Sequence, residues 1–166
     1  MTSGIRDKVA IIGMGCSRFG ERFDTDAQDL MYEAYVEARA DAGIDTRDID
    51  AAWLGHAMPD LGMGPTATPA SVALRLPNIP VTRVENACAT GTEALRGAVY
   101  AVASGAARIA LAIGVEKLKD TGFGGLPEFN FGPRETLYAP SMSAPGGFAQ
   151  LAAAYSHKFG VNPADL

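Results

Sequence analysis

The chain is poor in cysteine, histidine and tryptophan, and it has no long uninterrupted apolar run. Its 166 residues include two Cys, two His and one Trp. The two cysteines lie far apart in dissimilar contexts and do not suggest a disulfide framework, and together with the histidines they lack zinc-ligand spacing. No apolar stretch of about 18 residues occurs, so the sequence predicts no membrane-spanning helix. The N-terminal residues also lack a signal-peptide pattern.

Positive charge is scarce as well. The chain has 14 Lys and Arg against 19 Asp and Glu, which gives a net charge of −5. No cluster of basic residues marks a nucleic-acid surface, so we expect no nucleic-acid partner. Few cysteines and no secretion signal favour a reducing, cytoplasmic setting. Apolar residues make up 48% of the chain, which is normal for a soluble globular protein with a real core.

Strand-like and helix-like segments alternate along the first two thirds of the chain. The predicted strands are 9–12, 51–55, 81–84 and 108–115, and the predicted helices are 26–42, 69–76 and a helix after Cys88 that ends at Gly105. The last helix has apolar residues at helical spacing, which predicts a buried stripe of Leu95, Ala98, Val99, Val102 and Ala103. This alternation is typical of an α/β protein with a layered sheet.

The composition changes after residue 117. Residues 121–133 contain too much Gly and Pro for a regular element, and a helix with an apolar face from Phe148 to Phe159 follows. We therefore predict two domains, 1–119 and 120–166. Asn162 and Pro163 are typical of the first residues of a helix, so we expect the chain to end within a domain.

Cys88 is the main candidate for chemistry. It stands in Glu-Asn-Ala-Cys-Ala-Thr-Gly (85–91), between a predicted strand and a predicted helix. The unpaired N–H groups of a first helical turn carry partial positive charge, which favours the nucleophilic thiolate. A strand-to-helix turn also exposes the nucleophile in other α/β enzymes. The alternative is a small, buried and inert cysteine.

These residues resemble the thiolase family, in particular its sterol-carrier-protein-x-like, acetyl-CoA acetyltransferase branch. The resemblance rests on segments 9–20, 85–91, 112–117 and 143–160. It implies the N-terminal half of a thiolase fold, a layered α/β/α sheet, together with the start of the inserted loop domain. In the family, the catalytic His and a second Cys lie in the other half, which this chain does not include.

The resemblance also implies a reaction. Cys88 would attack an acyl-CoA or 3-oxoacyl-CoA thioester and form an acyl-cysteine, and the acyl group would pass to CoA or to an acetyl-CoA enolate. Met142, Gly146, Gly147 and Phe148 match the loop domain that lines the pantetheine and acyl tunnel, so they are the predicted substrate-binding residues. The family pattern implies a homodimer or tetramer and no metal or redox cofactor, with the CoA thioester as substrate.

Two alternatives stay open. One is a thiolase-fold retro-aldolase that acts on acyl-CoA side chains with a zinc-ribbon/OB-fold partner, and the other is a non-catalytic thiolase-like subunit. The presence of Cys88 favours acyl transfer, because a lyase need not keep the thiol. The other candidate residues are interpreted as structural. Asn86 orients the turn, Glu85 is a surface or interface charge, and Gly91 allows close packing of the helix. His56 is a satisfied loop histidine, and Cys16 and His157 have no catalytic role.

Overall fold

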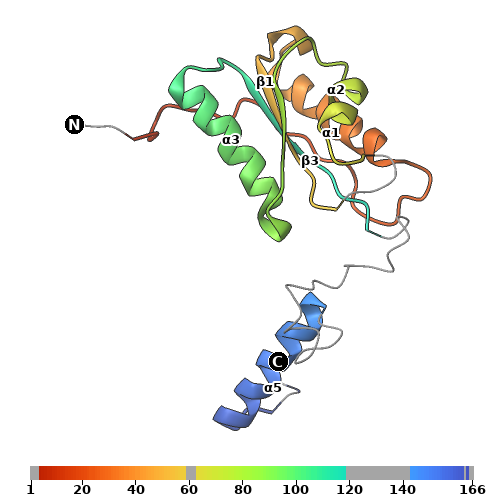
Figure 1. The fold of residues 1–166 in the computed structure, drawn as a ribbon, viewed down its shortest axis with the longest axis vertical. Helices are drawn as coiled ribbons and strands as arrows, with labels where there is room; N and C mark the ends of the chain where they lie inside the picture. Colours follow the sequence, from red (N-terminus) through yellow and green to blue (C-terminus); the bar gives the residue numbers. More distant parts are fainter. Residues whose placement is uncertain (1–3, 59–62, 119–142, 163, 165–166) are drawn as a thin grey trace. The chain divides into compact units, whose positions relative to one another are not determined.

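The computed structural model describes residues 4–58, 63–118, 143–162 and 164 (Figure 1). The chain divides into two compact units, Met1–Lys117 and Leu118–Leu166. Within the described residues, the first unit contains a parallel sheet with helices, and the second contains one long helix, α5 (Ala144–Phe159).

The sheet consists of β1 (Ala51–Gly55), β2 (Val81–Val84) and β3 (Ala110–Gly114) in the order β2-β1-β3, all parallel. Helices α1 (Ala27–Ala42) and α2 (Thr68–Ala73) lie on one face, and α3 (Thr90–Ser104) lies on the other (Figure 1). Successive strand residues point to opposite faces. This layered α/β/α arrangement confirms the predicted fold class.

Helix α1 begins and ends where the sequence predicts. Asp26 is its N-cap: its side chain accepts from the Asp29 N–H at 2.8 Å, and the Asp29 side chain accepts from the Asp26 N–H at 3.2 Å. Such a reciprocal box satisfies donors that the first turn leaves unpaired. Gly43 ends the helix with a φ of 65°, a left-handed conformation that glycine adopts without steric cost.

The main core lies between the sheet and the α1/α2 layer. Its buried members come from both helices, β1, β3 and the adjoining loops: Ala27, Met31, Tyr35, Ile49, Leu54, Met63, Ala70, Leu74 and Ile113. Asp50 fixes the strands at their beginnings, because its Oδ2 accepts from the N–H groups of Arg108 and Ile109 at 2.8 and 3.0 Å. These two hydrogen bonds lower the pKa of the Asp50 carboxyl below its ordinary value.

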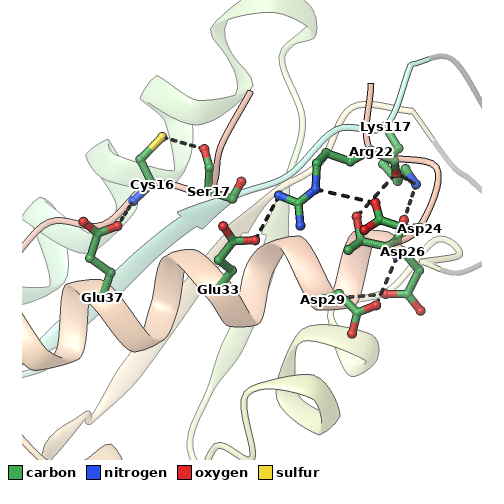
Figure 2. A network of polar contacts seen from close by, with 10 residues as sticks. Cys16, Ser17, Arg22, Asp24, Asp26, Asp29, Glu33, Glu37 and Lys117 are labelled. Carbon is green, nitrogen blue, oxygen red and sulfur yellow. Dashed lines mark hydrogen bonds and ion pairs between the residues drawn. The ribbon is translucent and has the colours of Figure 1, made fainter. Parts of the chain in front are cut away.

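The prediction of a buried strand at residues 9–12 is wrong. The segment has no strand structure, and Ile11 keeps 68% of its surface exposed. Just beyond it, two carboxylates of α1 accept backbone N–H groups. The Met14 N–H donates to Asp41 at 2.9 Å. The Cys16 N–H donates to Glu37 at 2.9 Å (Figure 2). Residues 9–12 therefore do not join the sheet, and the chain directly after them is bonded to side chains of α1.

Figure 2 also shows how β3 is joined to the segment before α1. The Lys117 ammonium, which follows β3, donates to the carbonyls of Arg22, at 2.9 Å, and Thr25. Arg22 in turn pairs with Glu33 on α1 at 3.2 Å. These contacts hold the residues that lead into α1 against the end of β3.

Three other predicted elements need correction. Helix α2 ends at Ala73 instead of residue 76, because Arg75 has a φ of 50°, outside the helical region. Strand β3 covers only 110–114 and is mostly half-buried. The buried side of α3 is formed by Thr90, Ala94 and Ala98, whereas Leu95 of the predicted stripe is 45% exposed.

The second unit begins its helix with a polar cap. The Ser143 side chain accepts from the Gly146 N–H at 3.2 Å, and α5 ends at Gly160, as predicted. Phe148, Leu151, Tyr155 and Phe159 are exposed on this helix. None of the helices in the described part of the chain combines the length and apolar character needed to cross a membrane.

Candidate active site

Cys88 lies between β2 and α3, as the sequence predicts. A short 3-10 helix, Ala87–Ala89, leads from the strand into α3, and Cys88 at its centre is exposed. The alternative of a buried cysteine is therefore wrong, and the reactivity of Cys88 stays a prediction. Because the strands are parallel, this turn lies at the carboxyl edge of the sheet, where α/β proteins commonly bind ligands.

The turn before the thiol is strained and tightly bonded. Ala87 has a φ of 45°, which costs a residue with a side chain about 1–2 kcal/mol. Its N–H donates to Glu85 Oε1 at 2.5 Å, and its carbonyl accepts from Thr90 Oγ1 at 2.6 Å. Thr90 Oγ1 also accepts from the Asn86 N–H at 2.9 Å. Side chains on both sides of Ala87 thus hold its unusual conformation.

The residues flanking the turn have local roles. The Asn86 side chain donates to Glu93 on α3 at 3.3 Å. This bond is consistent with a role of Asn86 in orienting the turn, which stays a prediction, as does the alternative of a contact with a dimer partner. The prediction for Gly91 is wrong, because a Cβ there would have no atom within 4 Å. The close approach is made instead by Gly55, where a Cβ would lie 3.0 Å from the Thr90 carbonyl oxygen.

His56 and Glu116 form a second polar group at the same edge of the sheet. His56 follows β1 directly and is 1% exposed, and its Nδ1 lies 3.0 Å from the Val115 carbonyl oxygen and 3.1 Å from Glu116 Oε1. The Glu116 carboxylate also accepts from the N–H groups of Ala57 and Met58 at 2.9 and 3.1 Å. The Nδ1 of His56 thus has partners within the fold, and the interpretation of His56 as a satisfied loop histidine stays a prediction.

Sequence reasoning assigned no role to Glu116 or Thr90. A signal for Glu116 was present: it follows one buried strand, His56 follows another, and the carboxyl ends of parallel strands share one edge. Thr90 carries no such signal, because its function depends on the φ of Ala87, which a sequence does not show.

The Glu116 carboxylate is stabilised in its charged form. Burial by itself would raise its pKa, but the hydrogen bonds from His56 and from the N–H groups of Ala57 and Met58 outweigh that effect and hold the pKa below its ordinary value. A carboxyl whose pKa is lower in the folded chain stabilises the fold above its unfolded pKa. That stabilisation is lost as pH falls through the folded pKa.

We therefore expect Glu116→Gln to weaken the acid dependence of stability. At neutral pH the variant should have a lower free energy of unfolding than the wild type, and the two values should converge as the carboxyl of the wild type becomes protonated. Urea titrations across the acid range measure this. Glu33→Gln is the matched control. Its carboxylate pairs with Arg22 at an exposed position on α1, where an ion pair contributes less than about 1 kcal/mol, so this variant should stay close to the wild type at neutral pH. Parallel wild-type and Glu116→Gln curves would contradict the expectation.

The remaining predicted residues lie apart from Cys88 in the chain. Cys16 is exposed, and its thiol donates to the Ser17 carbonyl at 3.3 Å (Figure 2). Gly146, Gly147 and Phe148 lie in the first turns of α5, and Phe148 is 72% exposed. Met142 lies outside the described residues. The substrate-binding role of these residues of the second unit stays a prediction.

The first unit also has a cavity of about 620 Å³. It lies between residues 9–15, helices α1 and α3, and residues 108–114. Cys88 does not line this cavity, and its lining is mainly apolar. Its position is therefore separate from the strand-to-helix turn that carries the thiol.

Comparison with known proteins identifies the family. The family model described as "Thiolase, N-terminal domain" matches residues 9–124, which is more than half of the chain. The chain is 37% identical over 162 residues to the acetyl-CoA acetyltransferase of Methanocaldococcus jannaschii, covering 95% of this chain and 41% of that protein. It is 35% identical over 120 residues to human sterol carrier protein 2, covering 70% of this chain and 22% of that protein.

Solved structures share the fold. The structure described as "Ltp2-ChsH2(DUF35) aldolase" has a TM-score of 0.66 at 20% identity, covering 92% of this chain and 39% of that one. A priming β-ketosynthase of the R1128 polyketide pathway has a TM-score of 0.55 at 20% identity, covering 77% and 45%. The chain thus spans less than half the length of these relatives. With its match to the N-terminal domain model and its similarity to acetyl-CoA acetyltransferases, it belongs to the thiolase family.

Proposed function

We propose that the chain takes part in acyl transfer between CoA thioesters and that Cys88 is the residue that accepts the acyl group. The observation that carries this proposal is the exposed thiol at the carboxyl edge of a parallel sheet, in the turn that begins α3. The similarity to acetyl-CoA acetyltransferases of two archaea supports the same chemistry.

The proposed step is a thioester exchange. The Cys88 sulfur attacks the acyl carbonyl and forms a new carbon–sulfur bond, and the bond to the CoA sulfur breaks. CoA leaves as its thiol with the proton that Cys88 gave up. N–H groups at the start of α3 would stabilise the negative charge that develops on the carbonyl oxygen. Thiolytic cleavage of a 3-oxoacyl-CoA and the reverse condensation both proceed through this acyl-cysteine.

Intact-mass spectrometry after incubation with acetyl-CoA tests the proposal. We expect one acetyl group on the wild type and none on Cys88→Ala, because Cys88 is the proposed acceptor. Cys16→Ala is the matched control: Cys16 is also exposed, and its replacement should leave the adduct in place. Acetylation of Cys16 to the same extent, or an adduct that persists in Cys88→Ala, would show that the reaction is not specific to the site.

A retro-aldol reaction is the second candidate. It is favoured by the fold similarity to the structure described as an aldolase. Such a cleavage would break a carbon–carbon bond of the acyl side chain, release a carbonyl compound and leave Cys88 unmodified. Carbonyl release from a 3-hydroxyacyl-CoA, equal in the wild type and Cys88→Ala, would favour this candidate over acyl transfer.

The proposed setting follows the family resemblance. We propose a cytoplasmic homodimer or tetramer that uses acyl-CoA and CoA. For the aldolase candidate, the proposed partner is a zinc-ribbon/OB-fold protein. The small number of cysteines supports the cytoplasmic setting. Native mass spectrometry at several concentrations measures the oligomeric state directly.

A further inference from the structure

We propose that Thr90 is a positioning residue for the Cys88 thiol. The inference rests on the proposed function, in which Cys88 accepts the acyl group, and it adds a second residue to that site. Thr90 does not touch the substrate in this proposal. It acts through the backbone of the turn that precedes and includes Cys88.

The first argument is the position of the Thr90 hydroxyl. Thr90 is the first residue of α3 and is only 6% exposed. Its Oγ1 donates to the Ala87 carbonyl at 2.6 Å and accepts from the Asn86 N–H at 2.9 Å. One hydroxyl therefore pairs with a donor and an acceptor on the two residues that precede Cys88. The Thr90 N–H donates to the same Ala87 carbonyl, so the backbone and the side chain of Thr90 both hold the turn.

The second argument is the conformation that these bonds maintain. Ala87 has a φ of 45°, and a residue with a side chain stays in this region only when its surroundings over-determine it. The direction of the Cys88 Cα–Cβ bond follows from the backbone of the residue before it. The hydroxyl of Thr90 adds its two bonds to those that Ala87 makes with the Glu85 carboxylate and the Thr90 N–H. When the two hydroxyl bonds are lost, we expect Ala87 to relax towards an ordinary conformation and the thiol to turn away.

The third argument is that Thr90 itself is fixed to the sheet. A Cβ on Gly55, the last residue of β1, would lie 3.0 Å from the Thr90 carbonyl oxygen and 3.2 Å from its Cγ2. The central strand therefore packs directly on Thr90. Since β1 pairs with both other strands, the turn and its thiol are held in register with the whole sheet.

Thr90→Val tests the proposal, because valine keeps the shape and loses the hydroxyl. We expect amide exchange at Asn86 to become about ten-fold faster, as for the loss of a buried hydrogen bond. Acetylation of Cys88 by acetyl-CoA should slow by about ten-fold or more, because a small displacement of a reacting group has a large effect on rate. Thr90→Ser restores the hydroxyl and should keep both rates within about two-fold of the wild type.

Thr92→Val is the matched control, since Thr92 is an exposed threonine two residues further along α3. It should change neither rate. Wild-type values of both rates in Thr90→Val would overturn the proposal, and so would a failure of Thr90→Ser to restore them. If Thr90 had a purely structural role, Thr90→Val would lower the stability of the chain without a selective loss of reactivity at Cys88. The alkylation rate of Cys16 in the same molecule is the reference against which a selective loss at Cys88 is measured.

Two further results separate this proposal from the proposed function. If the wild type is not acetylated, the acyl-transfer proposal fails. Positioning is then judged from Asn86 exchange and from iodoacetamide alkylation of Cys88 relative to Cys16, which must both change in Thr90→Val. If Thr90→Val does not fold, Gly55→Ala replaces it, because the added methyl presses on Thr90 and leaves the hydroxyl intact. An unchanged Cys88 reactivity in Gly55→Ala would then overturn the proposal.

Discussion

Replacing Leu54 by alanine should lower the free energy of unfolding by about 2–5 kcal/mol, the largest effect of a single substitution on stability that we expect. Leu54 lies in β1, the central strand, and is 0% exposed. It packs in one cluster with residues of α1, α2 and β3, including Met31 and Ile113. Removing its side chain leaves a cavity among elements that cannot all move inward. Urea titration followed by far-UV circular dichroism measures the change.

Leu95→Ala is the control for this prediction. Leu95 has the same side chain and lies in α3, but it is 45% exposed. We expect the free energy of unfolding to change by less than about 1 kcal/mol, as for surface substitutions. The two variants also test the packing of α3, because the sequence predicts that Leu95 is buried, whereas in the structure it is exposed. Equal losses in the two variants would contradict the observed orientation of α3.

The difference at α3 shows what a hydrophobic pattern can and cannot predict. Leu95, Val99 and Val102 have the spacing of an apolar stripe, so the existence and the end of the helix follow from the sequence. The side that faces the sheet is determined by steric fit instead. Ala98 of the predicted stripe is buried there, as expected, but its buried neighbour is Ala94 and not Leu95. Small residues at these positions let the helix axis come close to the strands.

The N-terminal segment differs for another reason. Residues 9–12 have the composition of a strand, yet strand formation requires a partner with free backbone groups in the right place. In the structure, Asp41 and Glu37 on α1 accept the N–H groups of Met14 and Cys16. A sequence pattern predicts the tendency of residues 9–12 to form a strand, but it does not show whether a strand partner lies within reach of their backbone groups.

The candidate site likewise has one part that the sequence predicts and one part that it does not. The strand-to-helix turn around Cys88 is a local feature, so the order of residues 85–91 was sufficient to predict it. The group of His56 and Glu116 joins residues about 60 positions apart and depends on β1 and β3 being neighbours. Sequence reasoning did not predict the order of the strands, and therefore it did not predict this group.

Replacing Gly97 by alanine should lower the free energy of unfolding by about 1–3 kcal/mol, although alanine is the better helix former. Gly97 lies where α3 packs on β1: a Cβ there would be 2.4 Å from Nε1 and 2.5 Å from Cδ1 of Trp53. No atom pair of this kind approaches so closely, so α3 or the indole ring must move. Thermal and urea unfolding measure the loss.

Two further variants show that the effect comes from this contact. Gly91→Ala lies in the first turn of the same helix, where a Cβ meets no atom within 4 Å, and it should stabilise the chain by about 0.5–1 kcal/mol. In a Trp53→Val background the indole is absent, and Gly97→Ala should then cost little or become favourable, which a double-mutant cycle reveals as coupling. An unchanged cost in that background would mean that Trp53 does not set the distance between α3 and the sheet. Since α3 begins at the Cys88 turn, that distance also determines where the thiol lies above the strand ends.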